Sequence, residues 1–290
     1  METESRSGII SLITDFGLAD TYAGQMKAVI LGIDPTLQVV DLTHKIPAQD
    51  VTEAAFQLAT AWLAFPEGTV HLAVVDPGVG TLRRPVAFRH DGHLFVLPDN
   101  GLATLVLTGK QPDRLVVLDR PEFHRPSVSQ TFHGRDIFAP VAGYLAAGQA
   151  LDEVGSATGT ATLTRLAIPP VDRGGSNVRG PVVSIDHFGN CRTLIQPSDL
   201  PAPPEQVQVR CGHMVIRGIV PTYGSVPKGR TLAHFGSHGG LEIAIRDGNA
   251  ARAWEITRGT IVELTPAVKR IHPGRSTLVY FSRHPFRCWL

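Results

Sequence analysis

The sequence predicts an N-terminal α/β domain with a mainly parallel central sheet, followed by a small C-terminal β-barrel domain. In the first half, short apolar runs alternate with helical patterns. A Pro- and Gly-rich connector follows at 168–176, and beyond it short strand patterns alternate with turn signals. We therefore expect a first domain over 1–168, a linker over 169–179, a barrel over 180–264 and a tail over 265–290.

Three apolar runs in the first half predict buried strands. They cover 8–14, 38–42 and 69–75, are rich in β-branched residues, and are bounded by Asp, Gly or Pro. Because a helical pattern separates each run from the next, the strands should be parallel and joined by right-handed crossovers.

Two helices are expected between these strands. The first begins near Tyr22. For the second, Asp50 is the predicted N-cap and Glu53 completes a capping box, while apolar residues recur at helical spacing over 51–62. Pro, Glu and Gly at 66–68 end it.

Weaker patterns predict the remaining elements. A hairpin is expected from 85–88 and 94–97, with more than two residues in its loop, and helices over 101–108 and 138–147. The barrel strands are expected at 180–185, 207–210, 214–219, 232–235, 241–245 and 260–264.

Composition limits the partners of the chain. A net charge of +1 over 290 residues provides no long-range field for nucleic acid or acidic lipid, which favours a small neutral or zwitterionic ligand. Cys191, Cys211 and Cys288 are odd in number and far apart, which argues against disulfides and thiolate zinc sites. The apolar run at 9–13 is too short for a signal peptide or membrane span, so we expect neither there. We expect a soluble, cytoplasmic protein that binds neither nucleic acid nor membrane. The basic tail is either an arm that binds nucleic acid or a partner, or a terminus with no chemistry, and we favour the terminus.

Two motifs bring together candidate catalytic residues. The run VVDPGVGTLR places Asp76 and Arg83 around a Pro-Gly turn, and TFHGRD contains His133. Asp76 follows an apolar strand, at the sheet edge where open α/β folds bind ligands. Separately, each residue is equally explained as a turn residue, a solvated charge or a structural histidine. His90 and His93 lack a carboxylate or Cys ligand set, so we expect neither a metal site nor a cofactor.

Three further segments contain candidate binding residues. Asp15, in TDFG, can accept hydrogen bonds from ribose hydroxyls, or form only an Asx-turn. The segment DHFGN contains Asp186, Phe188 and Asn190, which suit a nucleoside and an amino group, or form a β-turn with a buried aromatic. Ser237 begins a Gly-rich approach to a strand, or a simple hairpin turn. Neither GxGxxG nor GxxxxGK[ST] occurs, which argues against a phosphate cradle.

Taken in order, the motifs resemble one family. ITDFGLAD, DLTHKIPAQDV, HLAVVDPGVGT, LPDNGL, TFHGRDIFAP, IDHFGN and GLEIAIRDGNAA are similar to segments of the adenosine-forming S-adenosylmethionine (SAM) hydrolases, or SAM hydroxide adenosyltransferases. These share a superfamily with the SAM-dependent fluorinase and chlorinase. The resemblance implies a homotrimer whose active sites lie between the N-terminal domain of one subunit and the C-terminal domain of the next.

The resemblance also implies residue roles. It assigns Asp76, Arg83 and His133 to the attacking water, Asp15 to the ribose hydroxyls, Asp186 to the methionine amino group, and Phe188 and Asn190 to further substrate contacts. From its Gly-rich segment we add Ser237 to the expected substrate-binding residues. Gly240 departs from the family, since relatives commonly have an aromatic residue there, and the tail after Leu264 extends past the usual end.

The implied reaction is hydrolysis of SAM to adenosine and L-methionine by attack of water at C5′. The thioether leaves as a neutral group, so no general acid is needed, and Arg83 and His133 can stabilise developing hydroxide. The final acceptor of the water proton stays open. The alternatives are a SAM-dependent halogenase and a non-catalytic nucleoside-binding protein. Against the halogenase, Asp76 stands where halogenases have a Tyr-Pro turn, and Gly134 where the fluorinase has a halide-binding Ser.

Overall fold

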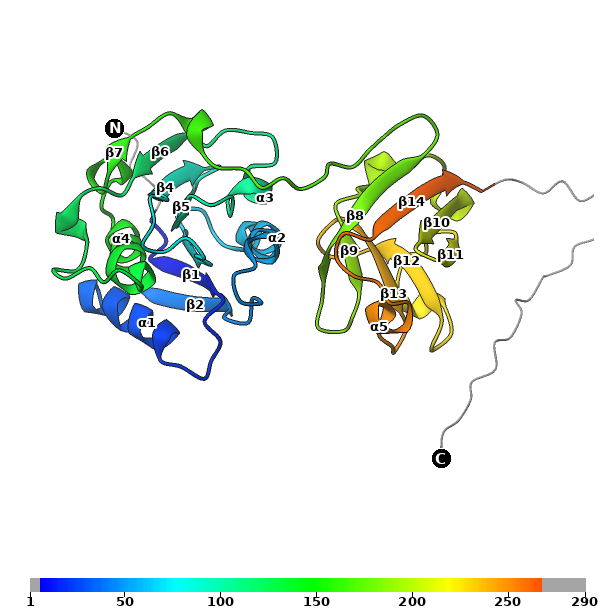
Figure 1. The fold of residues 1–290 in the computed structure, drawn as a ribbon, viewed down its shortest axis with the longest axis horizontal. Coiled ribbons are helices and arrows are strands. Elements are labelled where there is room, and N and C mark those ends of the chain that lie inside the picture. Colours follow the sequence, from blue (N-terminus) through cyan, green and yellow to red (C-terminus); the bar gives the residue numbers. More distant parts are fainter. Residues whose placement is uncertain (1–5, 268–290) are drawn as a thin grey trace, which may run out of the picture.

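A computed structural model describes residues 6–267, which form two units around two seven-stranded sheets (Figure 1). The first sheet has strand order β2-β1-β3-β5-β4-β6-β7, and the second, a barrel-like antiparallel sheet, has order β11-β10-β14-β8-β9-β13-β12. The predicted fold class, an α/β domain followed by a small β-barrel domain, is confirmed. Residues 268–290 of the predicted tail, including Cys288, lie outside the described residues.

The elements follow one another along the chain in two groups. The first domain contains β1 (Ile9–Thr14), α1 (Tyr22–Ile33), β2 (Gln38–Thr43), α2 (Val51–Ala61), β3 (Val70–Val74), β4 (Pro85–His90), β5 (His93–Pro98), α3 (Thr104–Leu107), β6 (Arg114–Val117), α4 (Ala139–Ala146) and β7 (Ser156–Ala157). The second contains β8 (Val178–Ile185), β9 (Cys191–Thr193), β10 (Val207–Cys211), β11 (Met214–Arg217), β12 (Thr231–Phe235), β13 (Leu241–Ile245), α5 (Ala250–Ala253) and β14 (Ile261–Pro266).

The first sheet is mixed. Strands β2, β1, β3 and β5 are parallel, whereas β4 and β6 pair in antiparallel fashion with their neighbours. β1 and β3 are buried as predicted, but β2 is largely exposed or half-buried, so its prediction as a buried strand is wrong. The reason is its position, because β2 is the edge strand and has only one neighbour.

The β4–β5 hairpin is tighter than predicted. Both strands extend toward Asp91 and Gly92, which form a two-residue turn with φ values of 46° and 77°. Two successive positive φ values are typical of the type I′ turn, whose twist matches that of the strands. The expected longer loop is therefore wrong.

Helices cover both faces of the first sheet and bury separate cores. Met26 and Ile30 of α1 pack with α4 and the strands on one face, while Leu58 of α2 and Trp62 pack on the other. Each such side chain contributes about 1.5–3 kcal/mol when it leaves water. The layered arrangement holds the carboxyl end of β3 between the two cores. No helix within residues 6–267 has the length and apolar character needed to cross a membrane.

The start of α2 also contacts the barrel. Asp50 is the N-cap as predicted, since its side chain accepts a hydrogen bond from the Glu53 amide at 3.0 Å. The capping box is wrong, because the Glu53 carboxylate points away to the barrel and accepts a 2.9 Å hydrogen bond from Ser184. Glu53 also lies 3.6 Å from the Arg192 guanidinium, and Arg258 forms an ion pair with Asp50. The Asp50 cap is therefore kept, while polar barrel side chains take the place of the reciprocal Glu53 contact.

A buried histidine makes stability depend on pH. His71 on β3 is fully buried and bonds through Nδ1 to Ser11 and through Nε2 to His93. Burial, with a smaller contribution from His93, lowers the pKa of His71 from 6.5 to about 3. The unfolded chain therefore binds the proton more tightly. The contribution of neutral His71 to the free energy of unfolding should be fully present above pH 6.5. It should fall by up to about 1.4 kcal/mol per pH unit between pH 6.5 and 3.

Urea unfolding at pH 7 and pH 4.5 measures this effect. In His71→Gln the difference in unfolding free energy between the two pH values should shrink, whereas the exposed control His213→Gln should keep it. An undiminished pH dependence in His71→Gln would mean that other groups cause it.

Candidate active site

Asp76, Arg83 and His133 form one connected group. Asp76 follows β3 at the carboxyl edge of the sheet, and its side chain is only 6% exposed. Arg83 Nε donates to both Asp76 oxygens, at 2.9 and 3.0 Å, and its Nη2 atom contacts the same carboxylate. That Nη2 also lies 2.9 Å from His133 Nδ1. The alternative of a solvated surface charge is wrong for Arg83, because its side chain is 9% exposed.

The turn between Asp76 and Arg83 requires a glycine. Gly80 has a φ of 76°, and a Cβ there would lie 2.7 Å from the carbonyl oxygen of Gln130. Only glycine permits both this conformation and this approach. Asn100 of the LPDNGL motif fixes the other side, since its Nδ2 donates to the Val75 carbonyl at 2.8 Å. The turn is thus held from two directions.

His133 precedes an unusual helical turn. Residues Gly134–Phe138 are π-helical and lead into α4, and such turns occur frequently at functional sites. The Phe138 ring lies 5.1 Å from the Arg83 guanidinium carbon, which favours the charged side chain there. Asp136 is fully buried and accepts hydrogen bonds from Arg135 and the Ser129 amide. It therefore fixes the loop that leads to His133.

The contact with Arg83 determines the tautomer of His133. A guanidinium only donates, so Nδ1 is the acceptor and the proton resides on Nε2. Burial, followed by the positive charge of Arg83, lowers the pKa of His133 below 6.5, although Asp76 and Asp136 oppose the shift. At neutral pH the imidazole is uncharged and offers one N–H donor.

A cavity of about 300 Å³ contains Asp15 together with Asp76 and His133. Asp15 Oδ2 accepts a 2.8 Å hydrogen bond from the Gln49 amide, while no group within residues 6–267 bonds to Oδ1. The aromatic ring of Phe16 forms an adjacent wall. The cavity therefore combines a hydroxyl acceptor, an apolar wall and two members of the three-residue group, Asp76 and His133, with Arg83 bonded to both from outside the lining. Its lining is completed by Ala48, Gln49, Val74, Pro77, Val79, Thr131, Phe132 and Gly134.

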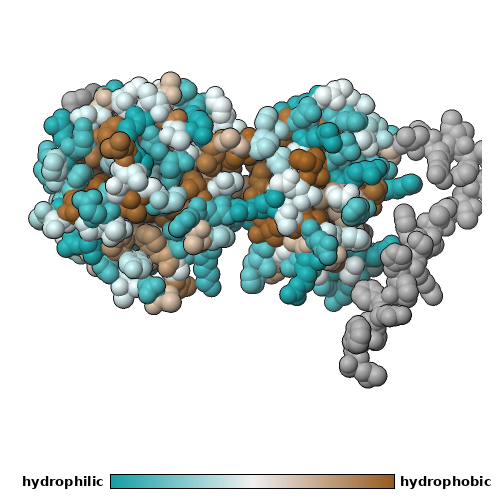
Figure 2. All heavy atoms as spheres, in the orientation of Figure 1, coloured by the Kyte–Doolittle hydropathy of each residue, from teal (hydrophilic) through white to brown (hydrophobic). Residues whose placement is uncertain are grey.

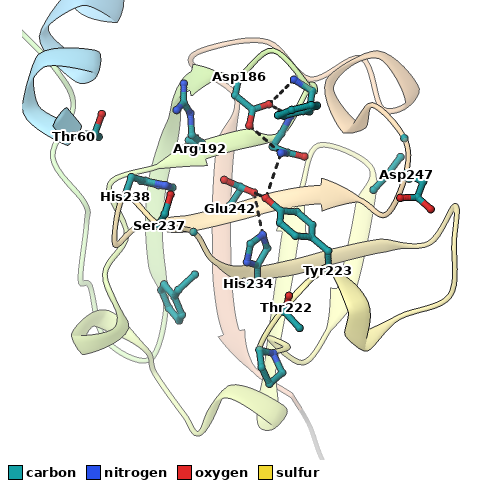
Figure 3. Close-up of a pocket in the computed structure, with 17 residues that line it drawn as sticks. Thr60, Asp186, Arg192, Thr222, Tyr223, His234, Ser237, His238, Glu242 and Asp247 are labelled. Carbon is teal, nitrogen blue, oxygen red and sulfur yellow. Dashed lines mark hydrogen bonds and ion pairs between the residues drawn. The ribbon is translucent and has the colours of Figure 1, made fainter. Parts of the chain in front are cut away.

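The barrel contains a second cavity, of about 860 Å³, whose lining includes Asp186, Phe188, Asn190 and Ser237 (Figure 3). Asp186 accepts hydrogen bonds from the backbone amides of Phe188 and Asn190, at 2.9 and 2.8 Å, so the segment is a side-chain-capped turn. The aromatic ring is not buried as the β-turn alternative required, because Phe188 is 69% exposed. It is available to contact a ligand.

The two cavities share no lining residue within the described chain. Sequence reasoning missed several side chains of the barrel cavity, among them Arg192, Tyr223, His234, His238 and Glu242. The available signal was Glu242, an acidic residue within the apolar strand pattern LEIAI. The space-filling view shows polar surface over much of both units, with apolar patches toward the side where they face each other (Figure 2).

Close packing explains why position 240 is a glycine. A Cβ there would lie 2.3 Å from the Thr193 carbonyl oxygen and 2.8 Å from His238 Nε2. This backbone leaves no room for an aromatic side chain at position 240, and the His238 ring lies against it. Among the described residues, no three His, Cys, Asp or Glu side chains are grouped to hold a metal ion.

The fold and the site define a two-domain protein in which the candidate residues line one cavity in the first domain and another in the barrel. Residues 10–155 match the SAM hydroxide adenosyltransferase N-terminal domain, and residues 180–263 match the C-terminal domain of that family. The chain belongs to the SAM hydroxide adenosyltransferase family, which confirms the resemblance drawn from its motifs.

Several relatives match nearly the whole chain. It is 40% identical to an (R)-S-adenosyl-L-methionine hydrolase of Salinispora tropica, covering 88% of this chain and 97% of the relative. A hydrolase of the same name from Thermus thermophilus is 39% identical, with 88% and 98% covered. A fluorinase of Actinoplanes sp. is less similar, at 28% identity with 89% and 98% covered. A crystal structure of an uncharacterized conserved protein from Thermotoga maritima has a TM-score of 0.83 and 35% identity, covering 88% of this chain and 99% of that one.

Proposed function

We propose that this protein is an adenosine-forming SAM hydrolase, which cleaves S-adenosyl-L-methionine to adenosine and L-methionine. The observation that carries the proposal is the connected group of Asp76, Arg83 and His133, of which Asp76 and His133 line one cavity with Asp15. The more similar relatives, named as (R)-S-adenosyl-L-methionine hydrolases, support the same reaction.

In the proposed reaction, water attacks C5′ of the substrate. The new O–C5′ bond forms as the C5′–S bond breaks. The electron pair of the broken C5′–S bond stays on sulfur and neutralises the sulfonium, so the thioether leaves without protonation. Arg83 and the Nε2–H of His133 stabilise the oxygen as it becomes hydroxide-like. Both oxygens of Asp76 accept hydrogen bonds from Arg83, which favours an orienting role over that of a strong base. The attacking water loses one proton overall.

The barrel residues complete the proposed site from a neighbouring subunit. We assign Asp186 to the methionine amino group and Phe188, Asn190 and Ser237 to further contacts with the substrate. Because the two cavities share no residue, closure in a homotrimer brings both sets to one substrate. The exposure of Phe188 (69%) and of Leu82 (99%), next to Arg83, supports an apolar contact between chains.

A product assay tests the proposal. Purified protein incubated with SAM should release adenosine and L-methionine in equal amounts, and the rate should be unchanged by a chelator of divalent metals. Binding of adenosine with SAM recovered intact would identify a non-catalytic binding protein instead.

The rate should also depend on the neutral form of His133. Its pKa lies below 6.5, so the imidazole is neutral above that pH and becomes protonated as the pH falls. Protonation of His133 places a hydrogen on Nδ1, so Nδ1 can no longer accept the hydrogen bond from Arg83 Nη2. We expect kcat to be level above pH 6.5 and to fall by about tenfold per pH unit below the pKa of His133.

Rates between pH 4.5 and 8 measure this dependence. His133→Asn keeps an acceptor near Nδ1 but cannot be protonated, so its lower rate should lose the acid limb. The exposed control His213→Gln should retain the wild-type profile. An acid limb that persists in His133→Asn contradicts this assignment.

A further inference from the structure

A chain of hydrogen bonds links His234, Glu242 and Tyr223 in the barrel cavity (Figure 3). His234 Nε2 lies 2.9 Å from Glu242 Oε1, and the Tyr223 hydroxyl donates to the same oxygen at 2.5 Å. Asn190 Nδ2 lies 3.4 Å from the Tyr223 hydroxyl and 2.9 Å from Asp186 Oδ2. None of His234, Glu242 or Tyr223 has a role in the proposed reaction.

The β-sheet holds the His234 and Glu242 end of this hydrogen-bond network in place. His234 of β12 and Glu242 of β13 are direct cross-strand partners, and both side chains are buried. Tyr223 lies in the short 3₁₀ turn Tyr223–Ser225, with its ring 4.4 Å from that of His234. The pairing of β12 with β13 therefore fixes the position of the carboxylate to which the Tyr223 hydroxyl points.

Charge determines the direction of each hydrogen bond. Burial opposes ionisation of Glu242, yet hydrogen bonds from His234 and Tyr223 hold its pKa below the usual value. A carboxylate only accepts, so Tyr223 must donate its single proton to Glu242. The Tyr223 oxygen can then only accept, and the hydrogen available to it comes from Asn190.

The same reasoning fixes the amide of Asn190. The Asn190 amide has two protein neighbours, the Tyr223 hydroxyl oxygen and the Asp186 carboxylate. Both are acceptors, so the NH₂ group of Asn190 must face them. Both amide hydrogens are thereby used. Asn190 Oδ1 has no hydrogen bond within residues 6–267, and it remains as an acceptor at the cavity.

We propose that Tyr223, held by Glu242 and His234, is a positioning residue that orients Asn190 to accept a hydrogen bond from an N–H group of the substrate. The proposal rests on the proposed function, since SAM has two such groups, the exocyclic amine of adenine and the ammonium of methionine. An oxygen acceptor in place of the N–H group would face Asn190 Oδ1 and be rejected.

Tyr223→Phe tests this directly, because it removes the hydroxyl and keeps the ring. Calorimetric titration with adenosine and with L-methionine separates the two sources of the N–H group. We expect about 3- to 10-fold weaker binding of the ligand that reaches Asn190, an equal rise in the KM for SAM, and kcat within about twofold of wild type. Tyr144→Phe, in the first domain, is the control and should bind both ligands like the wild type.

A double-mutant cycle separates positioning from direct contact. In an Asn190→Ala background, Tyr223→Phe should weaken binding no further, because the residue through which it acts is absent. Thermal unfolding of each variant checks that the barrel is folded. Unchanged affinity for both ligands in Tyr223→Phe, the full effect in the Asn190→Ala background, or no binding of either ligand to the wild type would each overturn the proposal. Failure of the proposed function is distinguished by intact SAM despite wild-type binding of these ligands.

Discussion

Asp76→Ala should lower kcat for SAM hydrolysis by about 100-fold or more. The substitution removes the carboxylate that holds Arg83 through both oxygens, and it leaves a guanidinium that is 9% exposed without its counter-ion. Arg83 is then free to leave His133, so the water loses its orienting group and both electrostatic partners. Initial rates at saturating SAM measure the effect.

Two further variants make the result specific. Asp76→Asn retains the shape of the side chain without its charge and should also lose most of the rate. Asp152→Ala removes an exposed aspartate that pairs with Arg114 on the surface, and it should leave kcat within about twofold of wild type. If folded Asp76→Ala turns over SAM within about threefold of wild type, Asp76 has no part in the mechanism.

Mixing two inactive chains should restore activity. Asp76→Ala damages only the first-domain cavity, and Asn190→Ala damages only the barrel cavity. If each site combines the first domain of one subunit with the barrel of the next, random exchange at equal amounts gives about one quarter of the sites two unmutated halves. The mixture should therefore recover about one quarter of the wild-type rate, measured at SAM concentrations below KM.

The control is a mixture in which exchange is prevented. Chains combined without an exchange step should stay as inactive as either parent, and mass spectrometry of tagged subunits verifies that mixed oligomers form in the other sample. Verified mixed oligomers without recovered activity, or a fully active monomer in light scattering, contradict the shared site.

The parallel half of the first sheet could be predicted from sequence because its apolar runs and helical periodicity are local signals. β1 and β3 were predicted to within one or two residues. The antiparallel half was harder, since β6 is four residues long with a charged end and β7 has only two residues. Their pairing depends on contacts distant in sequence. The proposed domain limits stay a prediction.

The candidate site likewise has one part that could be predicted from the sequence and one part that could not. Asp76, Arg83 and His133 lie in recognisable motifs, and their grouping followed from the carboxyl edge of the sheet. The barrel network was not predictable, because His234 and Glu242 meet only through the register of β12 and β13. A shift of one residue in that register would place them on opposite faces. Sequence alone does not determine that register.

Hydrolysis of SAM in oxygen-18 water containing high chloride tests the central claim most directly, because it reports which nucleophile attacks C5′. We predict adenosine with oxygen-18 at its 5′ position, an equal amount of L-methionine, and no chlorinated nucleoside. Formation of 5′-chloro-5′-deoxyadenosine, adenosine without the label, or complete recovery of SAM from folded protein would contradict the account.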